Sequence, residues 1–113
     1  MKSHHKLMVW QRSIDFIVEI YKLTDKFPKE EQYGLISQMR RAVVSIASNI
    51  AEGAGRNSKK EFKQFLSIAQ GSVSELETQL IIVQKLGYCM KLDELLRELD
   101  EISKMIIGLR KAI

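Results

Sequence analysis

The residues of this sequence best suited to chemistry are four cations that lie close together. Arg56 is followed by Lys59, Lys60 and Lys63, and Ser58 begins a serine-x-x-glutamate capping box, so the lysines fall in the first turns of a predicted helix. Cations at a helix N-terminus oppose the helix dipole, which stability alone does not favour. Free backbone amides at such an end suit a phosphate group. The cluster predicts an anion-binding turn; the alternative is a solvated turn whose lysines only keep the protein soluble.

The net charge of the 113-residue chain is concentrated in one part of the sequence. It is +4 overall, and residues 33–63 hold six basic residues against two acidic ones, while the remaining charges balance. A focused excess creates a local positive potential. The aromatic residues among these cations, Phe62 and Phe65, belong to the predicted core stripe, which argues against base stacking and for sequence-independent backbone contact. The predicted nucleic-acid-binding residues are Arg40, Arg41, Arg56, Lys59, Lys60 and Lys63.

Arrangements that would support catalysis are missing. The two histidines, His4 and His5, are neighbours in a polar N-terminal tail of residues 1–6, and no Cys, Asp or Glu lies near them in sequence. Cys89 is the single cysteine, so it forms no internal disulfide. The glycines Gly53 and Gly55 lack the spacing and preceding strand of a phosphate-binding loop. We therefore expect no enzymatic activity, no metal site and no cofactor.

Two polar residues lie within the apolar part of the predicted second helix. Glu52 has Asn49 three residues before it and Arg56 four residues after it. One hypothesis gives Glu52 a raised pKa and a role in proton transfer. The preferred alternative is a buried structural acid, whose replacement by Gln costs about 1–3 kcal/mol. Asn49 and Glu52 are therefore predicted to be structural polar residues.

Four helices must position these groups. Hydrophobic spacing and end signals predict helices over Leu7 to Lys26, Leu35 to Arg56, Lys59 to Leu86, and Leu92 to the C-terminus. Pro28 ends the first, a left-handed Gly53 or Gly55 is expected to end the second, and Gly87 the third. Short connections make sequential helices antiparallel. The sequence predicts one all-α domain, an up-down-up-down antiparallel four-helix bundle.

The third and fourth helices each carry one regular apolar stripe, whereas the first two are apolar over a wider surface. On the first helix Ile14, Val18 and Tyr21 belong to one stripe, and Phe16 and Ile20 to a second. The second helix is small or apolar nearly all round. Such helices are buried on more than one side, which predicts a homo-oligomer.

Two further patterns on the third helix concern packing. Phe65, Ile68, Ile81 and Ile82 are expected to widen its apolar stripe. Ser67, Gly71, Ser74 and Thr78 form a small-residue edge, interpreted as a close helix crossing.

The segments SQMRRAVVSIASNIAEGAGR and KKEFKQFLSIAQGSVSELETQL resemble the four-helix-bundle family of 23S-rRNA intervening-sequence proteins. The resemblance covers nearly the whole chain, and SNIAEG with the following KEF is its most specific part. It implies a bacterial homopentamer without an established activity. A related branch, the accessory protein of diversity-generating retroelements, is a basic pentamer that works with a reverse transcriptase and its RNA. The family commonly has Pro at the position of Ala47. Because Pro kinks a helix, the second helix of this chain is predicted to be straighter.

These observations leave two functional hypotheses besides the disfavoured enzyme. One is a non-catalytic homo-oligomer that binds RNA or DNA backbone through its basic patch. The other is an adaptor that docks a protein such as a reverse transcriptase and binds no nucleic acid itself. Because the chain lacks a signal peptide and any apolar run long enough to span a membrane, the sequence predicts a cytoplasmic protein with no membrane partner.

Overall fold

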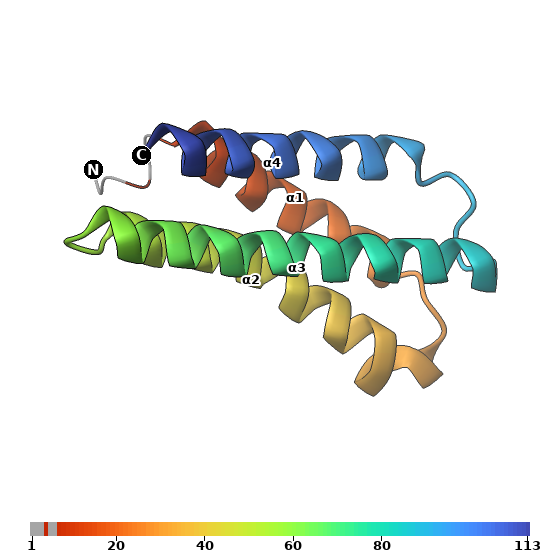
Figure 1. The fold of residues 1–113 in the computed structure, drawn as a ribbon. Helices are drawn as coiled ribbons and strands as arrows, with labels where there is room; N and C mark the ends of the chain where they lie inside the picture. The colour runs from red at the N-terminus through yellow and green to blue at the C-terminus, as the bar shows by residue number, and fades with distance from the viewer. Residues whose placement is uncertain (1–3, 5–6) are drawn as a thin grey trace.

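The computed structural model describes residue 4 and residues 7–113, and it is a bundle of four helices. They are α1 (Met8–Thr24), α2 (Ser37–Ala54), α3 (Lys59–Leu86) and α4 (Asp93–Ala112). Successive helices run in opposite directions, and each packs beside the next, with α4 returning to α1 (Figure 1). The predicted all-α, up-down-up-down architecture is confirmed. Of the predicted polar tail of residues 1–6, all but His4 lies outside the described residues.

The core is formed by one stripe from each helix. The stripe of α3 repeats alternately every three and four residues, which keeps it on one side of the helix against its antiparallel neighbours. The second predicted stripe of α1, with Phe16 and Ile20, is also buried. α2 runs without interruption through the buried Ala47. The buried residues of α3 and α4 are Leu66, Ala69, Val73, Leu76, Leu80, Val83, Leu99, Ile102 and Ile106.

The link between α1 and α2 is short, as predicted, and contains two regular turns. It contains the 3-10 turn η2 (Lys29–Glu31) and the π-turn η3 (Gln32–Ile36), which bends at Gly34. The Tyr88 hydroxyl, from the α3–α4 loop, donates a 2.7 Å hydrogen bond to the Glu31 carboxylate. This bond raises the pKa of Tyr88, because the neutral hydroxyl is the form that donates. Two connections far apart in sequence are thereby joined at one end of the bundle.

The helix-end predictions are partly confirmed. Ser58 caps α3 by accepting the Glu61 backbone N–H at 3.1 Å, and Gly87 ends α3 in the left-handed conformation with φ of 78°. The prediction for the end of α2 is wrong. Gly55 has φ of −86°, and Gly53 lies inside α2. A Cβ on Gly53 would lie 2.8 Å from Phe65 Cβ, so glycine is needed there for close approach of α2 and α3, not for its backbone freedom.

Replacing Gly53 by Ala is expected to destabilise the bundle, because the new methyl group overlaps the Phe62 and Phe65 side chains. Overpacking of about 1–3 kcal/mol outweighs the gain in helix propensity of up to about 1 kcal/mol. Denaturant unfolding should show a net loss of up to about 2 kcal/mol. Gly108→Ala in α4 is the control: a Cβ there meets nothing within 4 Å, so the free energy of unfolding should rise. Equal gains in both variants would contradict the close approach.

Several apolar residues that the sequence placed in packed stripes are exposed in the single chain. On α1, Ile14 is 37% exposed, Val18 50% and Tyr21 40%, and Val44 on the adjacent α2 is 38% exposed. We call these four residues the α1–α2 face. All four lie on the outer side of these helices, turned away from the core.

The expectations for the outer side of α3 are wrong for the single chain. The isoleucines predicted to widen its stripe are 41–53% exposed. A Cβ on Gly71 would meet nothing within 4 Å, so the small-residue edge is not a helix crossing within the chain.

Candidate nucleic-acid interface

A groove lined by three cations lies between the start of α3 and the end of α4. Lys60 and Lys63 come from the first two turns of α3, and Arg110 from the last turn of α4. The antiparallel arrangement brings these two helix ends to the same end of the bundle (Figure 1). The groove has a volume of about 510 Å³, and Gln64, Ser67 and Ile68 complete its lining. We call it the basic groove.

The three cations of the basic groove are not neutralised by acids. Salt bridges within the described residues pair Arg12 with Glu98, Arg56 with Glu52, and Lys104 with Asp100, and they leave the groove cations unpaired. Residues 52–63 and 110–111, which form this end of α2, α3 and α4, contain six basic and two acidic residues. The rest of the chain balances. The whole net charge of +4 therefore belongs to this end.

Arg56 and Lys59 lie at the same end but do not line the groove. The Arg56 guanidinium lies 4.8 Å from the centre of the Phe65 ring and 3.5 Å from the Glu52 carboxylate. These contacts tie the α2–α3 turn to α3 through Phe65 and to α2 through Glu52. Lys59 is exposed at the first position of α3. Both residues add to the positive potential without lining the groove.

Arg40 and Arg41 lie far from the other predicted cations. Arg40 precedes Arg56 by sixteen positions of a helical stretch, which separates them by about 24 Å along the axis. Its Nε donates a 2.9 Å hydrogen bond to Thr24 Oγ1, and its guanidinium lies 4.4 Å from the centre of the Tyr21 ring. Arg40 thus fastens α2 to α1, and Arg41 is exposed beside it. The six predicted residues do not form one patch.

The prediction that Glu52 is a buried acid is wrong for the single chain. Its side chain is 58% exposed, and its partner Arg56 lies one helical turn away. An exposed pair of this kind contributes at most about 0.5 kcal/mol, less than the loss expected from the sequence. Asn49 is half-buried, and its Nδ2 donates to Ser45 O at 2.8 Å and to Ser45 Oγ at 2.9 Å. Its bonds stay within its own helix.

The sequence interpretation missed Arg110. Basic residues near the end of a helix suit the helix dipole, so a count of charges along the chain gives those of α4 no further role. The signal that would have found Arg110 is the topology itself. In an up-down-up-down bundle the last turn of the fourth helix lies beside the first turn of the third.

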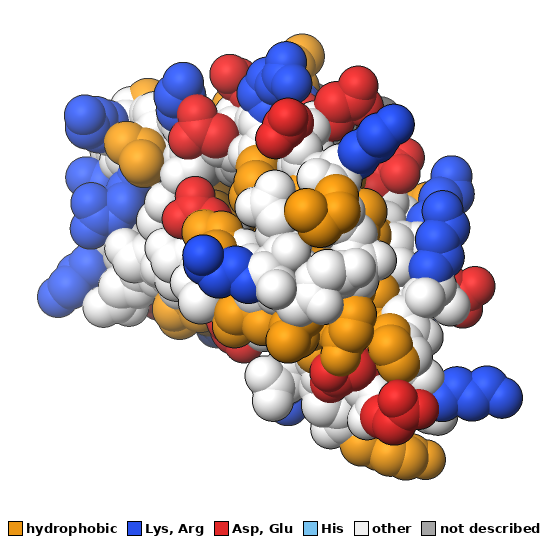
Figure 2. All heavy atoms as spheres, turned by 90° about the vertical axis from the view of Figure 1, so that its right-hand side faces the viewer, with side chains coloured by type: hydrophobic (Ala, Val, Ile, Leu, Met, Phe, Trp, Pro, Cys, Tyr) orange, Lys and Arg blue, Asp and Glu red, His pale blue; other side chains and the backbone are white. Residues whose placement is uncertain are grey.

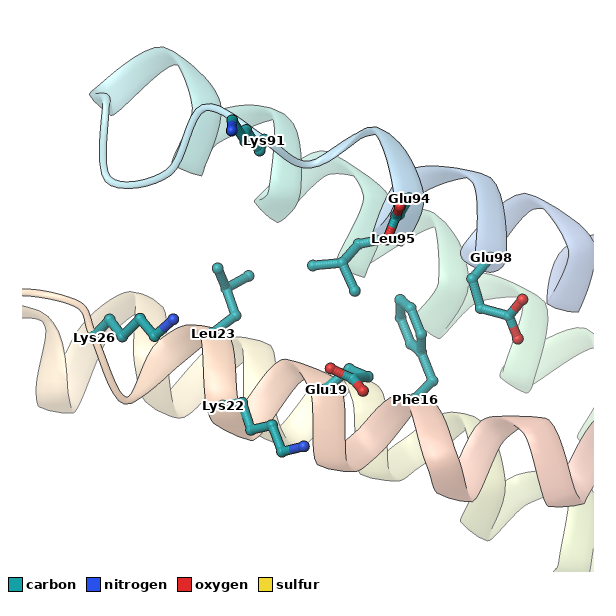
Figure 3. A pocket seen from close by; sticks show the side chains of 9 residues that line it. All are labelled: Phe16, Glu19, Lys22, Leu23, Lys26, Lys91, Glu94, Leu95 and Glu98. Atoms are coloured by element: carbon teal, nitrogen blue, oxygen red, sulfur yellow. The ribbon is translucent and has the colours of Figure 1, made fainter.

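A second groove separates α1 from α4 and is electrically neutral. Phe16, Leu23 and Leu95 form its floor, with Leu23 and Leu95 pointing toward one another (Figure 3). It has a volume of about 480 Å³ and a mixed rim. Arg12 crosses from α1 to the rim residue Glu98, and this hydrogen bond raises the pKa of Arg12. Because its charges cancel, this groove does not attract anions. The rim residues are Glu19, Lys22, Lys26, Lys91, Glu94 and Glu98.

Within the described residues, no three His, Cys, Asp or Glu side chains are grouped so that they could hold a metal ion. Over the same part of the chain, every helix is too short or too polar to cross a bilayer.

Comparisons with known proteins identify relatives without assigning an activity. The sequence profile of the family described as 23S rRNA-intervening sequence protein matches residues 5–108. The fold is similar to a crystal structure of a protein with unknown function from the S23 ribosomal protein family of Bacteroides thetaiotaomicron. The two share 26% sequence identity with a TM-score of 0.84, over 91% of this chain and 95% of the other. A search of curated proteins finds no match.

Proposed function

The chain belongs to the family of 23S rRNA-intervening sequence proteins, and on that premise we propose that it is a non-catalytic homo-oligomer that binds nucleic-acid backbones through the basic groove. The observation that carries the proposal is the set of three unpaired cations, Lys60, Lys63 and Arg110, in one groove at one end of the bundle.

The chemistry of the groove suits phosphodiesters better than bases. Lysine and arginine bind phosphate oxygens, and such contacts release counterions without selecting a sequence. The groove lining includes no aromatic ring on which a base would stack. The groove therefore favours the sugar-phosphate backbone of RNA or DNA.

The α1–α2 face supports the homo-oligomer. Ile14, Val18, Tyr21 and Val44 are each 37–50% exposed in the single chain. Contiguous exposed apolar side chains mark interaction surfaces. α3 offers further exposed apolar side chains, Ile81 and Ile82. Two different apolar surfaces suit a ring, in which one surface of each copy meets the other surface of the next. The family resemblance makes a pentamer the expected size, and a ring would repeat the basic groove in every subunit.

A second function, the docking of a protein partner, is favoured by the end of the bundle opposite the basic groove. Tyr33 is 91% exposed there, Met90 68% and Leu86 53%. Figure 2 looks at this end and shows hydrophobic side chains over its lower half, below a rim of mixed charges. Such a surface suits a protein partner such as a polymerase better than a nucleic acid.

A salt titration of binding to duplex RNA and duplex DNA separates the two functions. Under the proposal, the logarithm of the affinity falls linearly with the logarithm of salt concentration, with a slope of about −0.9 for each phosphate contacted. With three cations in each groove, we expect a slope of about −3 or steeper. Unrelated sequences should give similar slopes. Absent or salt-insensitive binding would contradict the proposal and leave the adaptor function.

A further inference from the structure

We infer that Arg110 is a phosphate clamp held in a fixed orientation by Ser67, and that it supplies the bidentate contact of the basic groove; the inference rests on the proposed function. The Arg110 Nε–H donates to Ser67 Oγ at 3.0 Å. This hydrogen bond joins α4 to α3 across the groove that both residues line. An arginine at the end of a helix does not need this hydrogen bond for the helix to form.

The bond to Ser67 uses one of the five N–H groups of the guanidinium. Its two terminal nitrogens have no salt-bridge partner among the described residues. A planar guanidinium presents its N–H groups in a fixed fork that matches two phosphate oxygens. Anchoring one nitrogen reduces the rotamer freedom lost on binding, because the fork is already oriented.

The lysines of the groove complete the site as point charges. Lys60 and Lys63 are three residues apart, so they project from one side of α3 toward the groove. A lysine ammonium is compact and flexible and does not require a particular oxygen geometry. The ligand of this arrangement is one phosphodiester gripped by Arg110, with the lysines on the same or the adjoining phosphates. Arg110 thus fixes the position of the backbone, and the lysines supply attraction.

The test compares Arg110→Lys with wild-type protein on duplex RNA over a salt series. Lysine keeps the charge but removes the fork, so affinity should fall about tenfold while the salt slope stays the same. Ser67→Ala keeps every charge and frees the guanidinium, and it should weaken binding by a smaller factor with the same slope. Lys111→Gln is the matched control, because Lys111 is exposed on the same turn but does not line the groove. Its effect should be smaller than that of Arg110→Lys although it removes a charge.

Two outcomes would overturn the clamp. One is an Arg110→Lys variant that binds as tightly as wild type while Lys60→Gln and Lys63→Gln weaken binding. In that case the groove is an unspecialised positive surface, and the proposed function survives. The other is a loss of affinity in Lys111→Gln equal to that in Arg110→Lys. That result would mean that Arg110 contributes only its charge. Wild-type protein that fails to bind any duplex would instead refute the proposed function itself. Circular dichroism on each variant shows whether the bundle has kept its helices.

Discussion

The Val18→Glu variant is expected to be a monomer, whereas the wild-type chain is expected to elute as an oligomer. Val18 is 50% exposed in the single chain, so a glutamate there stays solvated and leaves the fold intact. In an assembled interface the same carboxylate would be buried without a partner, at a cost of several kcal/mol. Light scattering should give about 65 kDa for a wild-type pentamer, five times the 13.0 kDa chain, and 13.0 kDa for the variant.

Met8→Glu is the control for this prediction. Met8 is also an apolar residue of α1 and is 62% exposed, but it lies about 120° around the helix from Ile14. The Met8→Glu variant should have the same mass by light scattering as the wild-type protein. A monomeric wild-type chain at micromolar concentration would refute the homo-oligomer. An unchanged mass in Val18→Glu would move the interface away from the α1–α2 face.

Replacing Lys60, Lys63 and Arg110 together by Gln is expected to weaken nucleic-acid binding about 100-fold near 0.15 M salt, at about fivefold for each lost phosphate contact. The salt slope should become shallower by about 3. The loss should be alike for every sequence, because the removed contacts are to the backbone. Fluorescence anisotropy with labelled RNA and DNA duplexes measures both quantities.

The matched control removes three cations from the other end of the bundle. Lys85, Lys91 and Arg97 are all exposed and lie outside the basic groove. Their replacement by Gln gives the same net charge and should change affinity far less. Equal losses in the two triple variants would show that total charge matters, and that the groove does not.

The sequence predicts the helices well because each one is encoded locally. The alternating spacing from Leu66 to Val83 defines the buried side of α3, and Ser58 and Gly87 mark its two ends. Such signals depend on residues within a few turns of each other. The end of α2 was mistaken for a different reason. Gly53 is needed because Phe65 approaches from another helix, and no spacing within α2 reports that.

The candidate site was only partly predictable. Sequence spacing shows which residues share one side of a helix, but not which residues of other helices lie beside them. Counting charges along the chain grouped Arg40 with Arg56, although the rise of the helix places them about 24 Å apart. The same count left out Arg110, which is far in sequence from Lys63 and close in space. The burial of Glu52 was misjudged because an apolar stretch of sequence was assumed to be buried on every side. Whether another copy of the chain covers those sides is decided by assembly and not by periodicity.

Lysine footprinting on the RNA-bound protein tests the central claim most directly. An acylating reagent modifies exposed lysines, and mass spectrometry compares the rate at each lysine with and without saturating duplex RNA. We expect slower modification of Lys60 and Lys63 and unchanged rates at Lys85 and Lys91, which lie at the other end of the bundle. Protection of Lys85 and Lys91, or equal rates at all four lysines with RNA bound, would contradict a nucleic-acid interface at the basic groove.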